Sequence, residues 1–151
     1  MILIDTASIY HSLKAVGKRL DYDSFIKYLL ETHGKQRTVV LYVDAEAEGF
    51  LKYLSTLEGI TIVTKPKIRK KISKKQRIWY LSFAVDISLS CTDSSQLVLV
   101  TTDVECVPIC EHVLECTLYG LGIPKALRDA CDYVFDIPEQ YLNNEGPSNE
   151  S

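Results

Sequence analysis

Short apolar runs alternate with amphipathic stretches along most of the chain, and this alternation restricts the fold more than any other feature of the sequence. Residues 38–43 (TVVLYV) and 97–100 (LVLV) have no polar face, as expected of strands that are buried on both sides. Residues 21–33 instead place apolar side chains on one face of a helix. Strands and helices that follow one another in this way are typical of a parallel sheet covered by helices.

The same patterns give the boundaries of the remaining elements. We predict strands at residues 2–4, 38–43, 60–63, 97–100, 116–119 and 133–135, and helices at 21–33, 45–57, 107–114 and 126–130. Residues 78–90 have helical spacing but also contain many strand-forming side chains, so their assignment stays open. The order of the elements allows a doubly wound sheet.

Length and composition predict one globular domain. The chain has 151 residues, of which 46% are hydrophobic and 25% charged, a balance that supports a real core. We expect residues 1–142 to form the domain. Residues 143–151 (NNEGPSNES) are polar, so we expect this tail to be disordered. No apolar run approaches the roughly 20 residues of a membrane span, and Asp5 comes too early for a signal peptide. We therefore expect a cytoplasmic protein with no membrane contact.

Cysteine usage also predicts a reducing compartment. The five cysteines are an odd number and are scattered, which does not suit a secreted disulfide framework. Cys106 and Cys110 lie four residues apart with His112 nearby, but there is no CxxC pair. We therefore expect buried apolar thiols and no zinc site at these residues.

The net charge of −3 conceals one strongly basic segment. Residues 65–77 (KPKIRKKISKKQR), called the basic segment below, hold eight of the seventeen lysines and arginines and no acid. Such a charge density attracts phosphates regardless of sequence, and nucleic acid is the ligand we expect. The alternatives are a solvated loop or a localisation signal. Its basic side chains are Lys65, Lys67, Arg69, Lys70, Lys71, Lys74, Lys75 and Arg77.

Acidic side chains follow two of the predicted strands. Asp5 ends the first strand, and Asp103 and Glu105 come soon after the strand at 97–100. If these strands are neighbours, the carboxylates converge at the carboxyl edge of the sheet, where open α/β sheets bind ligands. Oxygen ligands of this kind suit Mg²⁺ or Mn²⁺. The alternative is that Asp5, Thr102 and Asp103 only cap helices.

Several other activities lack a sequence signal. There is no GxxxxGK[ST] or GxGxxG motif, which disfavours nucleotide-cofactor binding. The three histidines are not arranged with a Ser or Cys as in a hydrolase triad. A receiver-like phosphoacceptor domain is a remote alternative, suggested by Asp44, Thr101 and Lys125. The sequence lacks the paired acids that such a domain is expected to have after the first strand.

Three segments of the chain match known sequence motifs in a fixed order. Residues 2–8 (ILIDTAS) are similar to a strand with Asp-x-x-Asn, and residues 99–108 (LVTTDVECVP) are similar to an apolar strand followed by Ser-Gly-Asp-x-Asp-Phe-x-Pro. Residues 122–127 and 131–135 are similar to a Gly-rich turn, a helix with Leu, and then Ala-Asp and a hydrophobic strand. In this order the segments resemble the NYN family of PIN-like nuclease domains. The resemblance implies a three-layer α/β/α, Rossmann-like sandwich and a Mg²⁺- or Mn²⁺-dependent ribonuclease.

The resemblance also implies roles for individual residues. The catalytic and metal-binding acids would be Asp5, Asp86, Asp103 and Glu105, with Ser8 or Thr102 positioning water or substrate. Ser8 stands where the family has Asn, and Glu105 where it has Asp. The middle motif matches at Asp86, although spacing would instead place Tyr80 there. An impaired domain that binds RNA or a protein partner without cutting is therefore the second hypothesis, and a homodimer is compatible with either.

Overall fold

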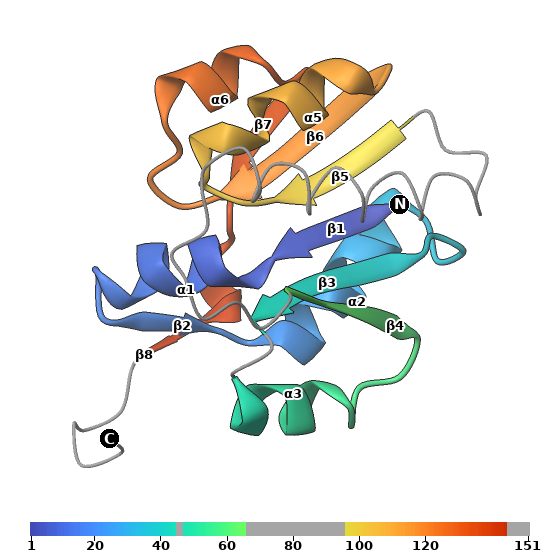
Figure 1. Cartoon of the computed structure of the whole chain (residues 1–151), viewed down its shortest axis with the longest axis vertical. Coiled ribbons are helices and arrows are strands. Elements are labelled where there is room, and N and C mark those ends of the chain that lie inside the picture. Colours follow the sequence, from blue (N-terminus) through green and yellow to red (C-terminus); the bar gives the residue numbers. More distant parts are fainter. Residues whose placement is uncertain (45–46, 66–95, 145–151) are drawn as a thin grey trace.

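The computed structural model describes residues 1–44, 47–65 and 96–144, and these residues form a parallel sheet between two layers of helices (Figure 1). Within this part of the chain the central sheet has six strands in the order β4-β3-β1-β5-β6-β7, and neighbouring strands are parallel. The strands are β1 (Ile2–Asp5), β3 (Val39–Asp44), β4 (Ile60–Lys65), β5 (Gln96–Val100), β6 (Glu115–Gly120) and β7 (Tyr133–Asp136).

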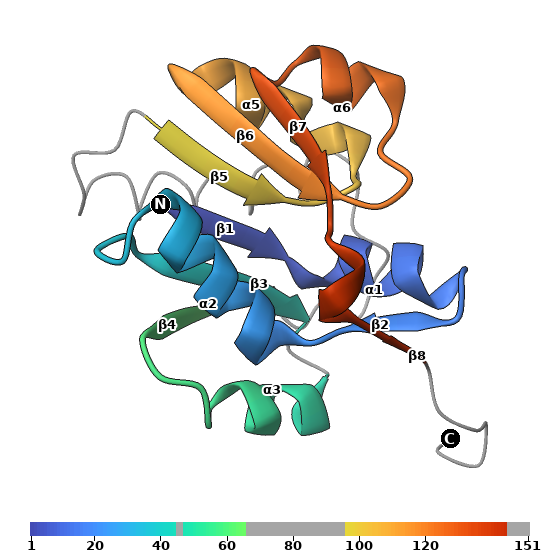
Figure 2. The same cartoon turned by 180° about the vertical axis from the view of Figure 1, so that it is seen from behind.

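Helices lie on both faces of this sheet. They are α1 (Thr6–Lys14), α2 (Tyr22–His33), α3 (Glu48–Leu54), α5 (Val107–His112) and α6 (Lys125–Asp129), with short 3-10 turns at η1 (Val104–Cys106) and η2 (Glu139–Tyr141). In Figure 2, α2 lies in front of the sheet and α5 behind it. The predicted three-layer α/β/α sandwich is confirmed.

The two helical layers enclose two separate hydrophobic cores, because side chains alternate across a strand. Ile2 and Ile4 point into the core under α1, α2 and α3, where Phe25 is fully buried. Leu3 points into the other core, which contains Ile109 of α5 and Leu127 of α6. The continuous apolar runs of the sequence therefore serve both faces of the sheet.

A second, smaller sheet joins the segment after α1 to the last of the described residues. Strand β2 (Lys18–Leu20) pairs antiparallel with β8 (Leu142–Asn144), with Leu20 opposite Leu142. Strand pairing thus continues two residues beyond the predicted domain boundary at 142. Residues 145–151 of the predicted tail lie outside the described residues.

The predicted strands are confirmed to within two residues at each end, and α2 has the capping that its sequence indicates. Asp21 accepts a hydrogen bond of 3.3 Å from the Ser24 backbone N–H, and Gly34, with φ of 132°, ends the helix. Helix α1 was not predicted. The open assignment at 78–90 lies outside the described residues. In the part of the chain described, no helix has the length and hydrophobicity that crossing a membrane requires.

Candidate active site at the carboxyl ends of β1 and β5

The order of the strands places a switch point between β1 and β5. The chain runs outward from β1 through β3 to β4, then returns to the other side of β1 and runs through β5 and β6 to β7. Ile4 pairs with Val100, so both strands end at the same level. The crevice outside the carboxyl ends at such a point is where open α/β sheets bind ligands. This pairing confirms the prediction that Asp5 and the residues after β5 lie close together.

The Asp5 carboxylate is buried and does not cap a helix. Asp5 stands at the N-cap position of α1, but its side chain makes no capping hydrogen bond. Asp5 is only 5% exposed, and its Oδ2 accepts a hydrogen bond of 3.0 Å from the Thr101 hydroxyl. The capping alternative therefore does not explain Asp5.

Burial raises the pKa of Asp5 above its usual value. Hydrogen bonds from Thr101 and Ser8 act in the opposite direction, and the Asp103 carboxylate raises the pKa further. Burial is the largest of these effects. The charged form of Asp5 is therefore costly, and a nearby cation would offset this cost.

Asp103 is a helix cap as well as a neighbour of Asp5. Its Oδ1 accepts a hydrogen bond of 3.0 Å from the Glu105 backbone N–H at the start of η1, as the capping alternative predicted. Asp103 and Glu105 are both half-buried.

Thr101 connects these groups and was not predicted as a site residue. It is fully buried, and its hydroxyl oxygen lies 3.0 Å from Asp5 Oδ2, 2.9 Å from Ser8 Oγ and 3.1 Å from the Asp103 backbone nitrogen. The sequence signal that could have found it is a polar residue directly after an apolar strand.

Ser8 and Thr102 join α1 to the loop after β5. Ser8 Oγ accepts a hydrogen bond of 3.2 Å from the Thr102 backbone N–H, and the Thr102 hydroxyl donates one of 3.4 Å to the Ser8 carbonyl. Ser12 Oγ lies 2.5 Å from Thr102 Oγ1. These hydroxyls hold the two sides of the crevice together, and their role toward substrate stays a prediction.

Gly120 allows the loop after β5 to approach β6 closely. A Cβ atom at this position would lie 2.9 Å from the Thr101 carbonyl oxygen and 3.0 Å from Thr102 Cγ2. The first distance is too short for a real Cβ atom, and the second is a tight contact with a side-chain methyl group. The absence of a side chain at Gly120 therefore allows the backbone at Thr101 to lie this close to β6.

Part of the predicted site lies outside the described residues. This applies to Asp86 and Tyr80 and to the basic side chains of Lys67, Arg69, Lys70, Lys71, Lys74, Lys75 and Arg77. The basic segment begins at Lys65, which is the last residue of β4 and pairs with Asp44. Its start therefore lies on the carboxyl side of the sheet, as predicted.

The donor set of the crevice suits a hard divalent cation. Asp5 and Asp103 offer carboxylate oxygens, and their neighbours Ser8 and Thr101 offer hydroxyl oxygens. Within residues 1–44, 47–65 and 96–144, no group of three carboxylates has its ligand atoms within 4.8 Å of one another. Mg²⁺ is commonly held by one or two carboxylates together with water and substrate phosphates. Two acids at this switch point fit that pattern.

A pocket of about 840 Å³ opens on the other side of α1. It lies between α1, β2 and α3, and Thr6 in its wall is the residue after Asp5. Burial and the Asp5 carboxylate raise the pKa of Tyr22 in the same wall. The wall of the pocket also contains the aromatic side chains of Tyr10, Phe50 and Tyr53 and the basic side chains of Lys18 and Arg19. No local sequence pattern predicts this pocket, because its wall is built from several elements that lie far apart in the chain.

The family model for the NYN domain matches residues 1–138. The chain belongs to the NYN domain family. The predicted resemblance is confirmed, and the NYN assignment replaces the receiver-like alternative. This NYN domain has a PIN-like nuclease fold. NYN domains are generally RNA-binding nucleases that use divalent metals.

A solved structure supports the same fold. The NYN domain resembles the crystal structure of a protein of unknown function from Vibrio parahaemolyticus, with a TM-score of 0.74, 20% sequence identity and 94% of each chain covered. No curated protein matches the sequence significantly. The structural likeness concerns the fold alone.

Proposed function

We propose that this NYN domain is a metal-dependent ribonuclease that hydrolyses RNA phosphodiester bonds with Mg²⁺ or Mn²⁺ at the carboxyl ends of β1 and β5. The observation that carries the proposal is the buried Asp5 carboxylate, which lies at the switch point beside Asp103 and does not serve as a cap. Burial and the Asp103 carboxylate both raise the pKa of Asp5, and carboxylates perturbed in this way gather at functional sites. Family membership supports the nuclease class.

In this proposal Asp5 and Asp103 hold the metal ion, and Asp86 and Glu105 add further carboxylates. A bound Mg²⁺ or Mn²⁺ supplies an activated water and stabilises the charge of the phosphoryl transition state. Thr101 fixes Asp5 through the hydrogen bond of 3.0 Å. Ser8 is joined to both Thr101 and Thr102, so it sets the distance between α1 and the Asp103 loop.

The RNA backbone would approach from the carboxyl side of the sheet. The basic segment starts there at the end of β4, and its eight basic residues would contact phosphates. The pocket beside α1 would accept a nucleobase, because Tyr10 and Tyr53 in its wall are partly exposed and a base could stack on their rings. Lys18 and Arg19 supply positive charge at the same pocket.

A second candidate is an NYN domain that binds RNA or a protein partner without cutting it. It is favoured by Ser8, which stands where the family has Asn. The orientation of Asp86, toward or away from the crevice, distinguishes the two functions.

Cleavage of labelled single-stranded and structured RNAs with Mg²⁺ or Mn²⁺ tests the proposal, with Asp103→Asn as the first variant. We expect metal-dependent cleavage by the natural chain and its loss in the variant. Asp103→Asn keeps an oxygen that can accept the Glu105 N–H, so the cap is preserved. RNA binding with no metal-dependent cleavage in either protein would favour the second candidate.

A further inference from the structure

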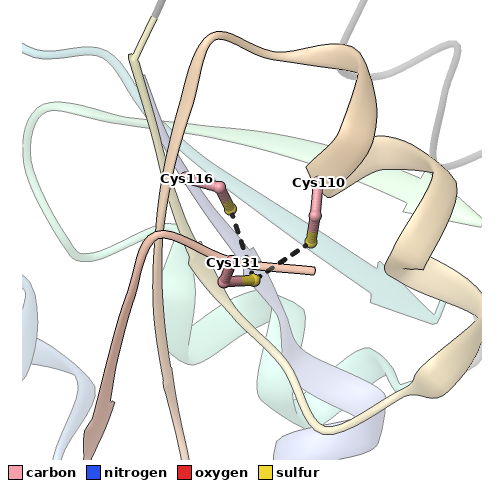
Figure 3. Close-up of side chains that lie close together, drawn as sticks. All are labelled: Cys110, Cys116 and Cys131. Carbon is pink, nitrogen blue, oxygen red and sulfur yellow. Dashed lines mark hydrogen bonds between the residues drawn. The ribbon is translucent and has the colours of Figure 1, made fainter. Parts of the chain in front are cut away.

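Three cysteine thiols meet at the other end of the sheet from the candidate active site. Cys110 comes from α5, Cys116 from β6, and Cys131 from the segment between α6 and β7 (Figure 3). Cys131 Sγ lies 3.4 Å from Cys110 Sγ and 3.8 Å from Cys116 Sγ, and all three sulfur atoms lie within 4.8 Å of one another. The predicted buried thiols are confirmed for Cys106 and Cys110, but the meeting of Cys110 with Cys116 and Cys131 was not predicted.

These separations are those of sulfur atoms around one metal ion. Zinc binds thiolates at about 2.3 Å, so two thiolates at a tetrahedral zinc lie about 3.8 Å apart. The two separations from Cys131 Sγ therefore need only small adjustments. Cys110 and Cys116 are buried, whereas Cys131 is half-buried. The cluster is thus closed on two sides and reachable from the side of Cys131.

We propose that Cys110, Cys116 and Cys131 form a binding site for a soft divalent cation, Zn²⁺ in particular, with water as the fourth ligand. Thiolate sulfur selects zinc over Mg²⁺ and Mn²⁺, which prefer oxygen. The site therefore differs in chemistry from the carboxylate crevice. It also lies apart from it, because Cys116 is near the start of β6 and Gly120 beside Thr101 is at its end. Four residues of strand span about 13 Å.

Backbone hydrogen bonds hold two of the ligands in register. The Cys116 N–H donates a hydrogen bond of 2.8 Å to Asp132 Oδ2, and the Asp132 N–H donates one of 3.0 Å to the Cys116 carbonyl. Asp132 directly follows Cys131. Outer contacts of this kind orient metal ligands and support their affinity.

The thiols also share hydrogen bonds. These bonds lower the pKa of Cys131 and, together with burial, raise that of Cys116. Zinc binds sulfur in its deprotonated form, so when Zn²⁺ forms three sulfur–zinc bonds the three thiols release their protons to solvent. The ion would then connect α5, β6 and the segment before β7.

Titration of the reduced, metal-free 151-residue chain with Cd²⁺ tests this site, because cadmium thiolates have a charge-transfer absorption that carboxylates do not give. We expect one equivalent of Cd²⁺ per chain to saturate the band and Zn²⁺ to displace it. Cys131→Ser should weaken binding at least tenfold. Cys131 is the variant of choice because it is half-buried, so its replacement disturbs the core least.

Two matched variants complete the experiment. Cys106→Ser removes a buried thiol that does not belong to the group of three, and it should keep the band. Asp103→Asn should also keep it, which separates this site from the proposed nuclease site. The proposal is overturned if the reduced protein gives no thiolate band, or if Cys131→Ser titrates like the natural chain. It is supported if Zn²⁺ raises the melting temperature of the natural chain and not that of Cys131→Ser.

Discussion

The hydroxyl oxygen of Thr101 lies 3.0 Å from Asp5 Oδ2 and 3.1 Å from the backbone nitrogen of Asp103. The hydroxyl donates its proton to the Asp5 carboxylate and accepts the Asp103 N–H. One buried side chain therefore sets the positions of two acids that come from different strands. This relationship makes Thr101 the first target for mutation.

Thr101→Val is expected to impair both stability and activity. The substitution keeps the shape of the side chain but leaves the Asp103 N–H without its acceptor and Asp5 Oδ2 without its donor. A buried polar group that loses its partner costs about 1–3 kcal/mol. We expect this loss in the free energy of unfolding, measured by urea denaturation, together with reduced RNA cleavage. Thr101→Ser keeps the hydroxyl and should retain most of both, and equal effects of Val and Ser would contradict this role.

Asp5→Asn is expected to stabilise the metal-free protein while removing cleavage activity. Burial raises the pKa of Asp5 in the folded state. The contribution of Asp5 to stability is therefore fully present below its unfolded pKa of about 3.9 and is lost as pH rises through the raised folded value. The neutral amide avoids this loss. The variant should melt at a higher temperature than the natural chain at pH 8, and the difference should shrink toward pH 4.

The same pair of proteins tests metal binding. Mn²⁺ that binds only the folded state raises its melting temperature. We expect this rise in the natural chain and a much smaller rise in Asp5→Asn. Equal shifts in both proteins would show that Asp5 does not hold the ion.

Gly120→Ala is expected to disturb the site without touching an acid. The added Cβ would lie 2.9 Å from the Thr101 carbonyl oxygen, so the loop that carries Asp103 must move. Overpacking of this kind costs about 1–3 kcal/mol, and we expect cleavage to fall as well. Gly49→Ala in α3 is the control, because its Cβ would meet nothing within 4 Å. It should be neutral or up to about 1 kcal/mol more stable by chemical denaturation.

Tyr10→Ala is expected to weaken RNA binding at the pocket beside α1. Loss of one stacked base costs about 1–3 kcal/mol, which is roughly 5- to 150-fold in affinity. Tyr10 is 54% exposed, so its removal should not unfold the domain. Tyr133 on β7 is 53% exposed and lies outside the pocket, so Tyr133→Ala is a matched control. Fluorescence anisotropy with a labelled single strand measures both, and equal losses would contradict a base-binding pocket.

The basic segment predicts a steep dependence of RNA affinity on salt. If all eight of its basic residues contact phosphates, the slope of log K against log salt for a single strand is about −6. Replacing Lys70, Lys71, Lys74 and Lys75 by Gln should reduce the slope by about half. Affinity that does not change with salt, or that survives the four replacements unchanged, would exclude the segment from binding.

Local sequence patterns determined the layers of this fold. The apolar run at 38–43 became β3, and Asp21 and Gly34 mark the two ends of α2. The segment at 6–14 was missed because Ser8 and Ser12, which face Thr101 and Thr102, interrupt its apolar pattern. The inner face of this helix packs partly through hydroxyl contacts, so its sequence lacks the continuous apolar face by which a helix is usually recognised.

The sequence by itself also determined the candidate acids, because Asp5 and Asp103 each follow a recognisable strand. Only the tertiary structure decided that β1 and β5 are neighbours, and that Thr101 joins the two acids. It alone brought Cys110, Cys116 and Cys131 together. The physical reason is that strand pairing and helix packing fix distances between residues far apart in the chain, whereas sequence spacing reports only on neighbours within one element.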